Sequence, residues 1–195
     1  KEGKVCGNLE RIGGVPAELL DEIMEPVVGM ERGETAEVAA AADIEKAGAA
    51  DYQPFCYRNK AQFPIGTDKE GHVITGFYAG RTHNIISNTD CILGVPVNKE
   101  ILECILAFME EYKILPYNEE KHTGLVRHVL IRYGFTTDEI MVCLILNGEE
   151  LPHAEVLVER LRKIPGMTSI TINVNKKRSN VILGEEIRLL WGQEY

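Results

Sequence analysis

The stretch from Gly124 to Leu146 constrains the fold more than any other part of the chain. Two runs rich in Val, Ile, Leu and Tyr flank the segment Gly134–Asp138, whose residue types tolerate tight backbone geometry, so the stretch predicts a β-hairpin. The second run is almost wholly apolar, which predicts a strand that is central or covered on both faces. The first run carries Arg127, His128 and Arg132 and is expected to keep part of itself in water.

Segments on either side of the hairpin complete an α+β pattern. Apolar spacing and stop signals predict helices over residues 1–12, 16–24, 99–113 (with Asn98 as N-cap) and from Pro152 to the stop at Pro165-Gly166. Strands are predicted over 62–66, 72–80, 84–88, 169–174 and 181–191. From residue 84 onward this order indicates a ferredoxin-like split β-α-β core, an antiparallel sheet with helices on one face and the other face free for a partner.

The charge of the chain is unevenly distributed. Residues 1–53 hold five Lys/Arg against twelve Asp/Glu, a net charge of −7, whereas residues 54–195 hold sixteen against eighteen, a net charge of −2. We therefore expect residues 1–53 to form a helical segment followed by a mobile, acidic, Ala-rich insertion at 31–51, after an extended stretch at 25–30. Residues 54–195 are expected to form the α+β domain. Because the first residue is Lys1, the chain is expected to be a piece of a longer protein.

Several function classes lack support in the sequence. No apolar run approaches the ~20 residues of a membrane span and no leader opens the chain, so a cytoplasmic protein without membrane contact is expected. The five cysteines form no Cys-x-x-Cys pair, which indicates neither a zinc site nor a disulfide framework. Neither a Gly-x-Gly-x-x-Gly loop, nor a Walker motif, nor a His-x-x-x-His pair occurs, so nucleotide or metal chemistry has no local signature.

Basic residues at predicted strand ends and loops are more informative. If one sheet brings them together, they would form a local positive surface suited to RNA phosphates, with aromatic side chains available to stack on unpaired bases. The alternative is that they are solvated positions alternating with core residues. The candidates are Arg58, Lys60, Arg81, His83, Arg127, His128, Arg132 and residues 176–178, with Tyr57, Phe77 and Tyr78 as the aromatic residues.

A family resemblance rests on five short motifs in order. They are Tyr57-Arg-Asn-Lys60, Gly76-Phe-Tyr78, His83-Asn-Ile-Ile86, Cys91 and Gly124-Leu-Val-Arg-His-Val-Leu-Ile-Arg132. In sequence and spacing this set resembles the RNA uracil-5-methyltransferases of RumA/TrmA type. The resemblance implies a parent enzyme that transfers a methyl group from S-adenosylmethionine to C5 of a uridine in ribosomal or transfer RNA, with 23S ribosomal RNA favoured. In that family a cysteine thiolate adds to C6 of the flipped-out base, and a general base then removes the C5 proton.

The resemblance covers only part of such an enzyme. The family's cofactor motif, Asp-x-x-Cys-Gly-x-Gly, and its nucleophilic cysteine follow the stretch at which this chain ends, and its TRAM-type barrel and Cys-Gly-Gly-Cys run precede Lys1. The chain is therefore expected to be the central, RNA-positioning domain, inactive alone, with the TRAM and methyltransferase domains as its partners in cis. Cys91 matches the fourth cysteine of a [4Fe-4S] site in the parent, whose other three ligands are not found here.

Two further hypotheses remain open. A protein-interaction or scaffold module would dock neighbouring domains through its free sheet face and have no RNA affinity of its own. An independent small-molecule enzyme is the third hypothesis, and no predicted site supports it. The remaining cysteines match no functional position, and Cys104 and Cys143, set in apolar runs, are expected in the core.

Overall fold

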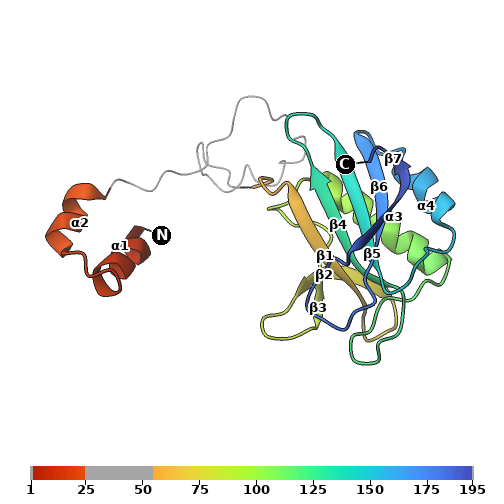
Figure 1. Ribbon diagram of the computed structural model, residues 1–195, viewed down its shortest axis with the longest axis horizontal. Coiled ribbons are helices and arrows are strands. Elements are labelled where there is room, and N and C mark those ends of the chain that lie inside the picture. Colours follow the sequence, from red (N-terminus) through yellow and green to blue (C-terminus); the bar gives the residue numbers. More distant parts are fainter. Residues whose placement is uncertain (1, 25–54, 195) are drawn as a thin grey trace. The chain divides into compact units, whose positions relative to one another are not determined.

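The computed structural model describes residues 2–24 and 55–194 (Figure 1). The chain forms two compact units, Lys1–Pro54 and Phe55–Tyr195.

The N-terminal unit contains two short helices in contact, α1 (Glu2–Arg11) and α2 (Ala17–Ile23). Leu20 of α2 is buried, and Pro16 occupies the N-cap position of this helix. The two predicted N-terminal helices are thus confirmed. The predicted extended stretch 25–30 and the acidic insertion 31–51 lie outside the described residues.

The second unit is built on one seven-stranded sheet with the order β3-β2-β1-β4-β5-β6-β7. All neighbouring strands are antiparallel except β5 and β6, which run parallel. The α+β class and the mainly antiparallel sheet are as predicted. The strands are β1 (Lys60–Thr67), β2 (Val73–Tyr78), β3 (Ile85–Ser87), β4 (Val126–Tyr133), β5 (Ile140–Leu146), β6 (Met167–Val174) and β7 (Glu186–Gly192).

The predicted hairpin is formed by β4 and β5 at the centre of this sheet. Its turn is closed by backbone bonds from Gly134 and Asp138, and Asp138 adopts the left-handed conformation that the turn requires. All residues of β5 except Met141 are buried, because β4 and β6 flank the strand and both of its faces are covered.

Helices α3 (Val97–Glu111) and α4 (Ala154–Leu161) pack on the same face of the sheet (Figure 1). Their inner side chains and alternate residues of the strands form the main apolar core, in which each fully buried Leu or Ile contributes about 2 kcal/mol. Helical spacing in the sequence predicts Leu157, Val158, Leu161 and Ile164 as the inner face of the α4 segment, and all four are buried. Phe108 of α3 is also buried, although it lies outside the apolar stripe that the sequence predicts for this helix, namely Ile101, Leu102, Ile105, Leu106, Met109 and Tyr112.

Three details of the prediction are wrong. Helix α3 begins two residues earlier than predicted, so Pro96 is its N-cap and Asn98 lies buried inside the helix. The last strand begins at Glu186 and not at residue 181. The split β-α-β arrangement is absent from the described sheet, because β3 lies at its edge beside β2, and the β5-α4-β6 unit joins strands that are direct neighbours.

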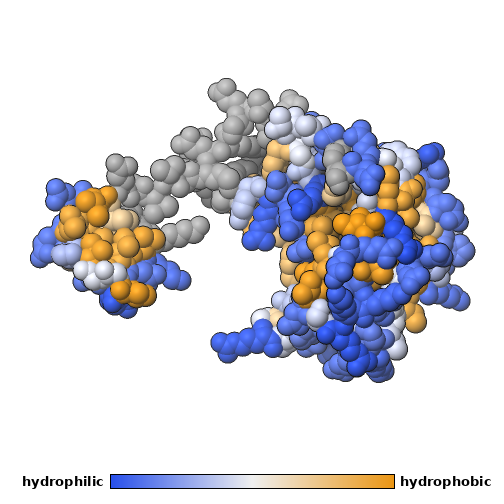
Figure 2. All heavy atoms as spheres, viewed as in Figure 1, coloured by the Kyte–Doolittle hydropathy of each residue, from blue (hydrophilic) through white to orange (hydrophobic). Residues whose placement is uncertain are grey.

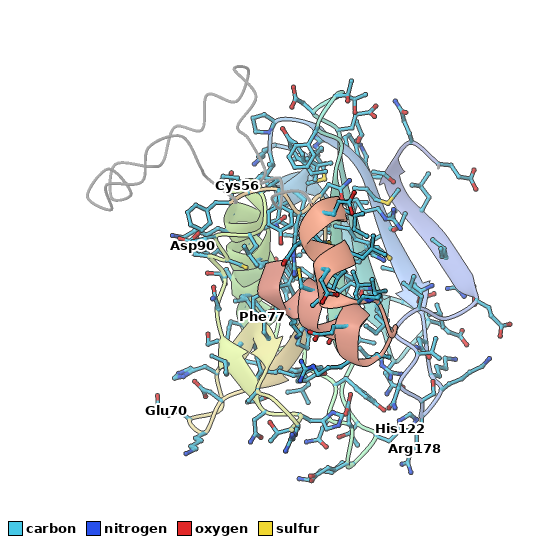
Figure 3. The ribbon with its side chains drawn as sticks, turned by 90° about the vertical axis from the view of Figure 1, so that its left-hand side faces the viewer. Cys56, Glu70, Phe77, Asp90, His122 and Arg178 are labelled. Carbon is cyan, nitrogen blue, oxygen red and sulfur yellow. The ribbon has the colours of Figure 1, made fainter. Side chains whose placement is uncertain are left out.

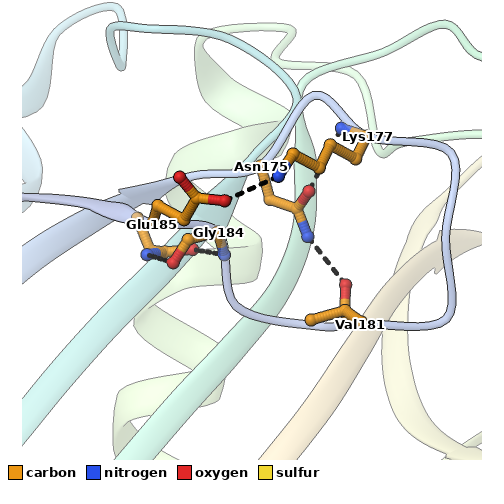
Figure 4. Close-up of polar contacts among 6 residues, drawn as sticks. Asn175, Lys177, Val181, Gly184 and Glu185 are labelled. Atoms are coloured by element: carbon orange, nitrogen blue, oxygen red, sulfur yellow. Dashed lines mark hydrogen bonds and ion pairs between the residues drawn. The ribbon is translucent and has the colours of Figure 1, made fainter.

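The segment Lys176–Glu185, predicted in part as strand, folds as a loop beside the second face of the sheet (Figure 4). Ile182 of this loop packs on Leu130, Cys143 and Ile145, which form a small apolar cluster on the face opposite the helices. Since this loop covers part of the sheet, the predicted free face is only partly free.

Two buried asparagine side chains hold this loop in place. The Asn175 amide donates to the carbonyl oxygens of Val181 and Ile182 at 2.7 and 2.9 Å, and its oxygen accepts the Lys177 amide at 3.1 Å. Asn173 exchanges hydrogen bonds with the Gly184 backbone at 2.6 and 3.1 Å, part of the network drawn in Figure 4. We refer to Asn173, Asn175 and these bonds as the asparagine clasp.

Among the described helices, none is both long and apolar enough to cross a bilayer.

Candidate nucleic-acid interface

Three predicted basic residues come together at the end of the sheet where β1 begins and β4 ends. Lys60 and Arg132 are cross-strand partners, so their side chains leave the same face of the sheet, and Arg58 precedes β1 by two residues. All three are exposed, and none forms an ion pair or side-chain hydrogen bond within the part of the chain that the structure describes. We call these residues the cation cluster.

The surface around the cation cluster is hollowed. One open depression of about 250 Å³ is lined by Lys60 and Arg132 together with residues of the β4–β5 turn. A second, of about 400 Å³, lies where β1 separates from β2 and is lined by Arg58, Lys60, Phe77 and Cys91. Positive side chains at the rims of such depressions are suited to the phosphates of an RNA strand.

Arg127 has a different environment from the one predicted. It is 4% exposed, and its guanidinium donates from Nη1 to the carbonyl oxygens of Asn175 and Lys177 at 2.8 and 2.9 Å. The same group lies over the Tyr117 ring, 4.4 Å from its centroid. The expectation that Arg127 points into water is therefore wrong, and its contacts connect β4 with the loop after β6.

His128 is also buried, at 7% exposure, although it was expected to lie partly in water. The pairing of β4 with β5 shifts between Val126 and His128, and this irregularity interrupts the regular alternation of side chains. Burial, with a smaller contribution from the Arg127 charge, lowers the pKa of His128 to about 4. The His128 ring is therefore neutral near pH 7.

Arg81 and His83 lie in the turn between β2 and β3, away from the register positions of the cation cluster. Both are exposed, and His83 Nδ1 lies 2.7 Å from a Glu119 carboxylate oxygen. The sheet thus brings Arg58, Lys60 and Arg132 together, but it does not add Arg81 and His83 to that group.

The remaining basic candidates belong to the loop that the asparagine clasp holds. Lys176 pairs with Glu149 and Lys177 with Glu185, whereas Arg178 has no ion pair among the described residues. Figure 3 labels Arg178 and His122 at the same end of the body, where the loops that carry them both approach Arg127. Two of the three charges in this basic run are neutralised locally.

The aromatic candidates differ in availability. Tyr57 and Tyr78 are 42% and 40% exposed. Phe77 packs against Phe63 with ring centroids 5.6 Å apart and is half-buried, so it contributes to the core on the helix side.

Cys91 is half-buried beside the second depression. Within residues 2–24 and 55–194, no group of three or more potential metal ligands includes it. The described residues therefore do not by themselves fit a four-cysteine cluster. Cys143 is buried as predicted, Cys104 is half-buried, and burial raises the pKa of both thiols.

An exposed group of possible ligands occurs in the β1–β2 turn, formed by Asp68, Glu70 and His72. The Asp68 carboxylate accepts the backbone amides of Glu70 and His72, each at 2.9 Å. These bonds, that of His72 first, lower the pKa of Asp68, and they are those of an ordinary capped turn.

Sequence reasoning missed the residues that organise the far end of the sheet. Tyr117 contacts Arg127, Glu119 pairs with His83, and the two clasp asparagines hold the loop after β6. The asparagines could be recognised in the sequence, because they lie two residues apart at the end of an apolar strand. Both therefore face the same side of the strand, and an element that covers this side buries their polar side chains.

Comparisons with known proteins give consistent results. No protein-family model matches the chain. Across its whole length it is 41% identical to an uncharacterized RNA methyltransferase of Halalkalibacterium halodurans, of which it covers 37%, and 35% identical to one of Clostridium tetani, of which it covers 36%. A third such protein, from Staphylococcus epidermidis, is 39% identical over 72% of the chain. The chain thus spans about a third of the length of these relatives.

A solved structure shows the same relationship. The tRNA (uracil-54, C5)-methyltransferase of Pyrococcus abyssi, in complex with S-adenosyl-L-homocysteine, matches 73% of this chain and 33% of its own with a TM-score of 0.58. The sequences are 27% identical over this match.

Proposed function

Because the chain belongs to the RNA methyltransferases of RumA/TrmA type, of which it spans about a third, we propose that it is the RNA-positioning domain of such an enzyme. In this proposal residues 54–195 bind the RNA and the chain has no methyl-transfer activity of its own. The parent enzyme methylates C5 of a uridine with S-adenosylmethionine as the methyl donor and acts in the cytoplasm. The TRAM and methyltransferase domains are the partners of this domain in cis.

The observation that carries the proposal is the cation cluster. Three exposed cations gather at one end of a sheet in a protein whose formal charge is −9. No acidic side chain among the described residues forms an ion pair with them, and Glu139 is the acidic residue that lines the same depression as Lys60 and Arg132. Unpaired cations on an acidic protein are suited to an anionic ligand, and RNA is the substrate that the relationship to RNA methyltransferases implies.

Titration of labelled RNA with the full chain tests this proposal. We expect weak, salt-sensitive binding that Lys60→Ala and Arg132→Ala each reduce severalfold. Lys99→Ala and Arg162→Ala remove the same charges at sites paired with Asp90 and Glu159, and they serve as matched controls. Equal affinities for all four variants and the parent chain would contradict the proposal.

The RNA class is part of the same test. Ribosomal RNA is the favoured substrate, while the Pyrococcus abyssi enzyme acts on tRNA. Titrations should therefore compare a 23S ribosomal RNA hairpin with a tRNA fragment that contains uridine 54. Preference for the tRNA fragment would assign tRNA as the substrate class and leave the proposed role unchanged.

Cys91 as an iron–sulfur ligand in the parent remains a separate proposal. Its half-buried position beside the second depression leaves its thiol near the surface. An assembled cluster would be detected by the iron content and visible absorption of the longer protein, and both should fall in a Cys91→Ser variant.

A scaffold role is the second candidate function, because apolar side chains are exposed along β7 and the loop before it. Figure 2 shows apolar surface in this region, and the residues concerned are Val181, Leu183, Ile187 and Leu189. Such a patch is suited to docking another domain. Absence of RNA binding at low salt would favour this candidate over the first.

A further inference from the structure

The face of the sheet opposite the helices also carries an aromatic group that the cation cluster does not include. Tyr78, at the end of β2, has its ring centroid 5.5 Å from that of His83 and 6.4 Å from that of His128. The planes of Tyr78 and His83 meet at 61° in an edge-to-face contact, so the two rings present one angled surface, which we call the wedge. Tyr78 is 40% exposed, and the His83 side chain is 74% exposed.

The turn that carries His83 is held by its own hydrogen bonds. The amides of Ala79 and Thr82 donate to Asn84 and Ala79 carbonyl oxygens at 2.8 and 3.0 Å, and the Asn84 amide donates to Thr82 Oγ1 at 3.2 Å. Arg81 lies within this turn in the left-handed conformation, with φ of 62°, and is exposed. The turn therefore presents a cation and an imidazole from a fixed backbone.

The His83 ring is oriented by Glu119. With its Nδ1 atom 2.7 Å from a carboxylate oxygen of Glu119, the ring donates from Nδ1 and keeps Nε2 as its remaining hydrogen-bonding atom. The carboxylate repels a phosphate from its own side of the ring, which leaves Arg81 as the cation of this turn for a phosphate.

His128 supports the Tyr78 ring. It is buried, and its ring lies in edge-to-face contact with that of Tyr78. This contact helps to fix the position of the Tyr78 ring.

From these contacts we infer that Tyr78 and His83 form a stacking site for one unpaired RNA base, with Arg81 contacting the neighbouring phosphate. This inference rests on the proposed RNA-binding function and deepens it. Aromatic faces accept any base, and a tilted pair of rings stacks on the base with one ring and contacts its edge with the other.

The position of the site agrees with a continuous RNA path. By strand register, His128 and Pro64 lie four residues from Arg132 and Lys60 on the same face of the sheet. Four residues of a strand span about 13 Å. Since Tyr78 lies against His128, the wedge and the cation cluster are separated by a distance that a few nucleotides cover.

Binding of two oligomers by the full chain tests the inference. A short fluorescein-labelled oligouridine and an abasic ribose–phosphate oligomer of the same length carry the same phosphates, so only the first offers bases. The parent chain should bind oligouridine more tightly than the abasic oligomer. Tyr78→Ala and His83→Ala together should reduce this ratio of affinities about 5- to 100-fold. Tyr78→Phe keeps the ring and should keep the preference.

The outcomes separate this inference from the function on which it rests. If Tyr78→Ala loses folded structure, His83→Ala, an exposed position, decides alone. If the parent chain prefers oligouridine and the variants keep the full preference, the stacking site is excluded and the proposed role of the cation cluster is unaffected. A parent chain that binds neither oligomer at low salt overturns the proposed function and this inference together.

Discussion

Arg127 and Arg132 lie on the same strand five residues apart and have opposite environments. Arg132 is exposed beside Lys60, whereas Arg127 is buried against the Tyr117 ring and two backbone carbonyl groups. Residue type alone predicted the same role for both. Arg127 is covered by Tyr117 and by the loop after β6, about fifty residues away in the sequence, so no local pattern distinguishes the two arginines.

Replacing each arginine should separate stability from RNA binding. Arg127→Ala leaves the carbonyl groups of Asn175 and Lys177 without this donor and removes the contact with Tyr117, so we expect a loss of about 3 kcal/mol in the free energy of unfolding. Arg132→Ala should change that free energy by about 0.5 kcal/mol or less while weakening RNA binding. Urea denaturation measures the difference, and equal losses for both variants would contradict the assignment.

His128 should make stability depend on pH. Because its pKa is about 4 in the folded chain and near the ordinary value of 6.5 in the unfolded chain, only the unfolded chain gains this proton between these two values. Stability is thus complete above pH 6.5 and falls by about 3 kcal/mol as the pH drops to 4. Urea midpoints across this range should show the fall, and His128→Gln should show it less. An unchanged pH profile in the variant would exclude His128 as the cause.

At the scale of elements, the sequence predicts best where local pattern and tertiary packing agree. The hairpin β4–β5 and the inner face of α4 follow from alternation and helical spacing, and both are found as predicted. Residues 181–183 before β7, Val-Ile-Leu, are apolar like the residues of a strand. This segment folds as a loop because the amides of Asn173 and Asn175 satisfy its backbone groups, a contact that requires the folded sheet.

Removing one asparagine of the clasp should loosen this loop without unfolding the sheet. Asn175→Ala removes the hydrogen bonds to two carbonyl groups and to the Lys177 amide, which should lower the free energy of unfolding by about 1–3 kcal/mol. Hydrogen exchange should show faster exchange of Lys177 and its neighbours in the loop. The exposed Asn180 of the same loop provides the control, since Asn180→Ala should leave these rates unchanged. Equal rates in both variants would argue against the clasp.

At the scale of the whole molecule, fold class was more predictable than strand order. Counting elements indicated an α+β domain with an antiparallel sheet, but a ferredoxin-like order requires β3 to cross into the centre of the sheet. Instead, β1 and β2 separate β3 from β4, because β1 pairs directly with β4 over residues 60–64. Such long-range pairing leaves no mark in local periodicity.

The candidate interface was predictable to a similar degree. The sequence named Arg58, Lys60 and Arg132 only as members of a longer set of basic candidates, and the register of β1 and β4 selects Lys60 and Arg132 as neighbours. The contribution of Glu119 to the Tyr78 wedge depends on a loop about forty residues away in the sequence and could not be predicted.

The salt dependence of RNA affinity tests the central claim, that the cation cluster contacts RNA phosphates, most directly. Each phosphate contact contributes about 0.7 to the slope of log K against log salt for single-stranded RNA. The triple variant Arg58→Ala/Lys60→Ala/Arg132→Ala should therefore reduce the slope by about 2. The variant Lys99→Ala/Arg162→Ala/Lys163→Ala removes the same number of charges from exposed positions on and after the helices and should leave the slope unchanged. Equal slopes for both triple variants would contradict the claim.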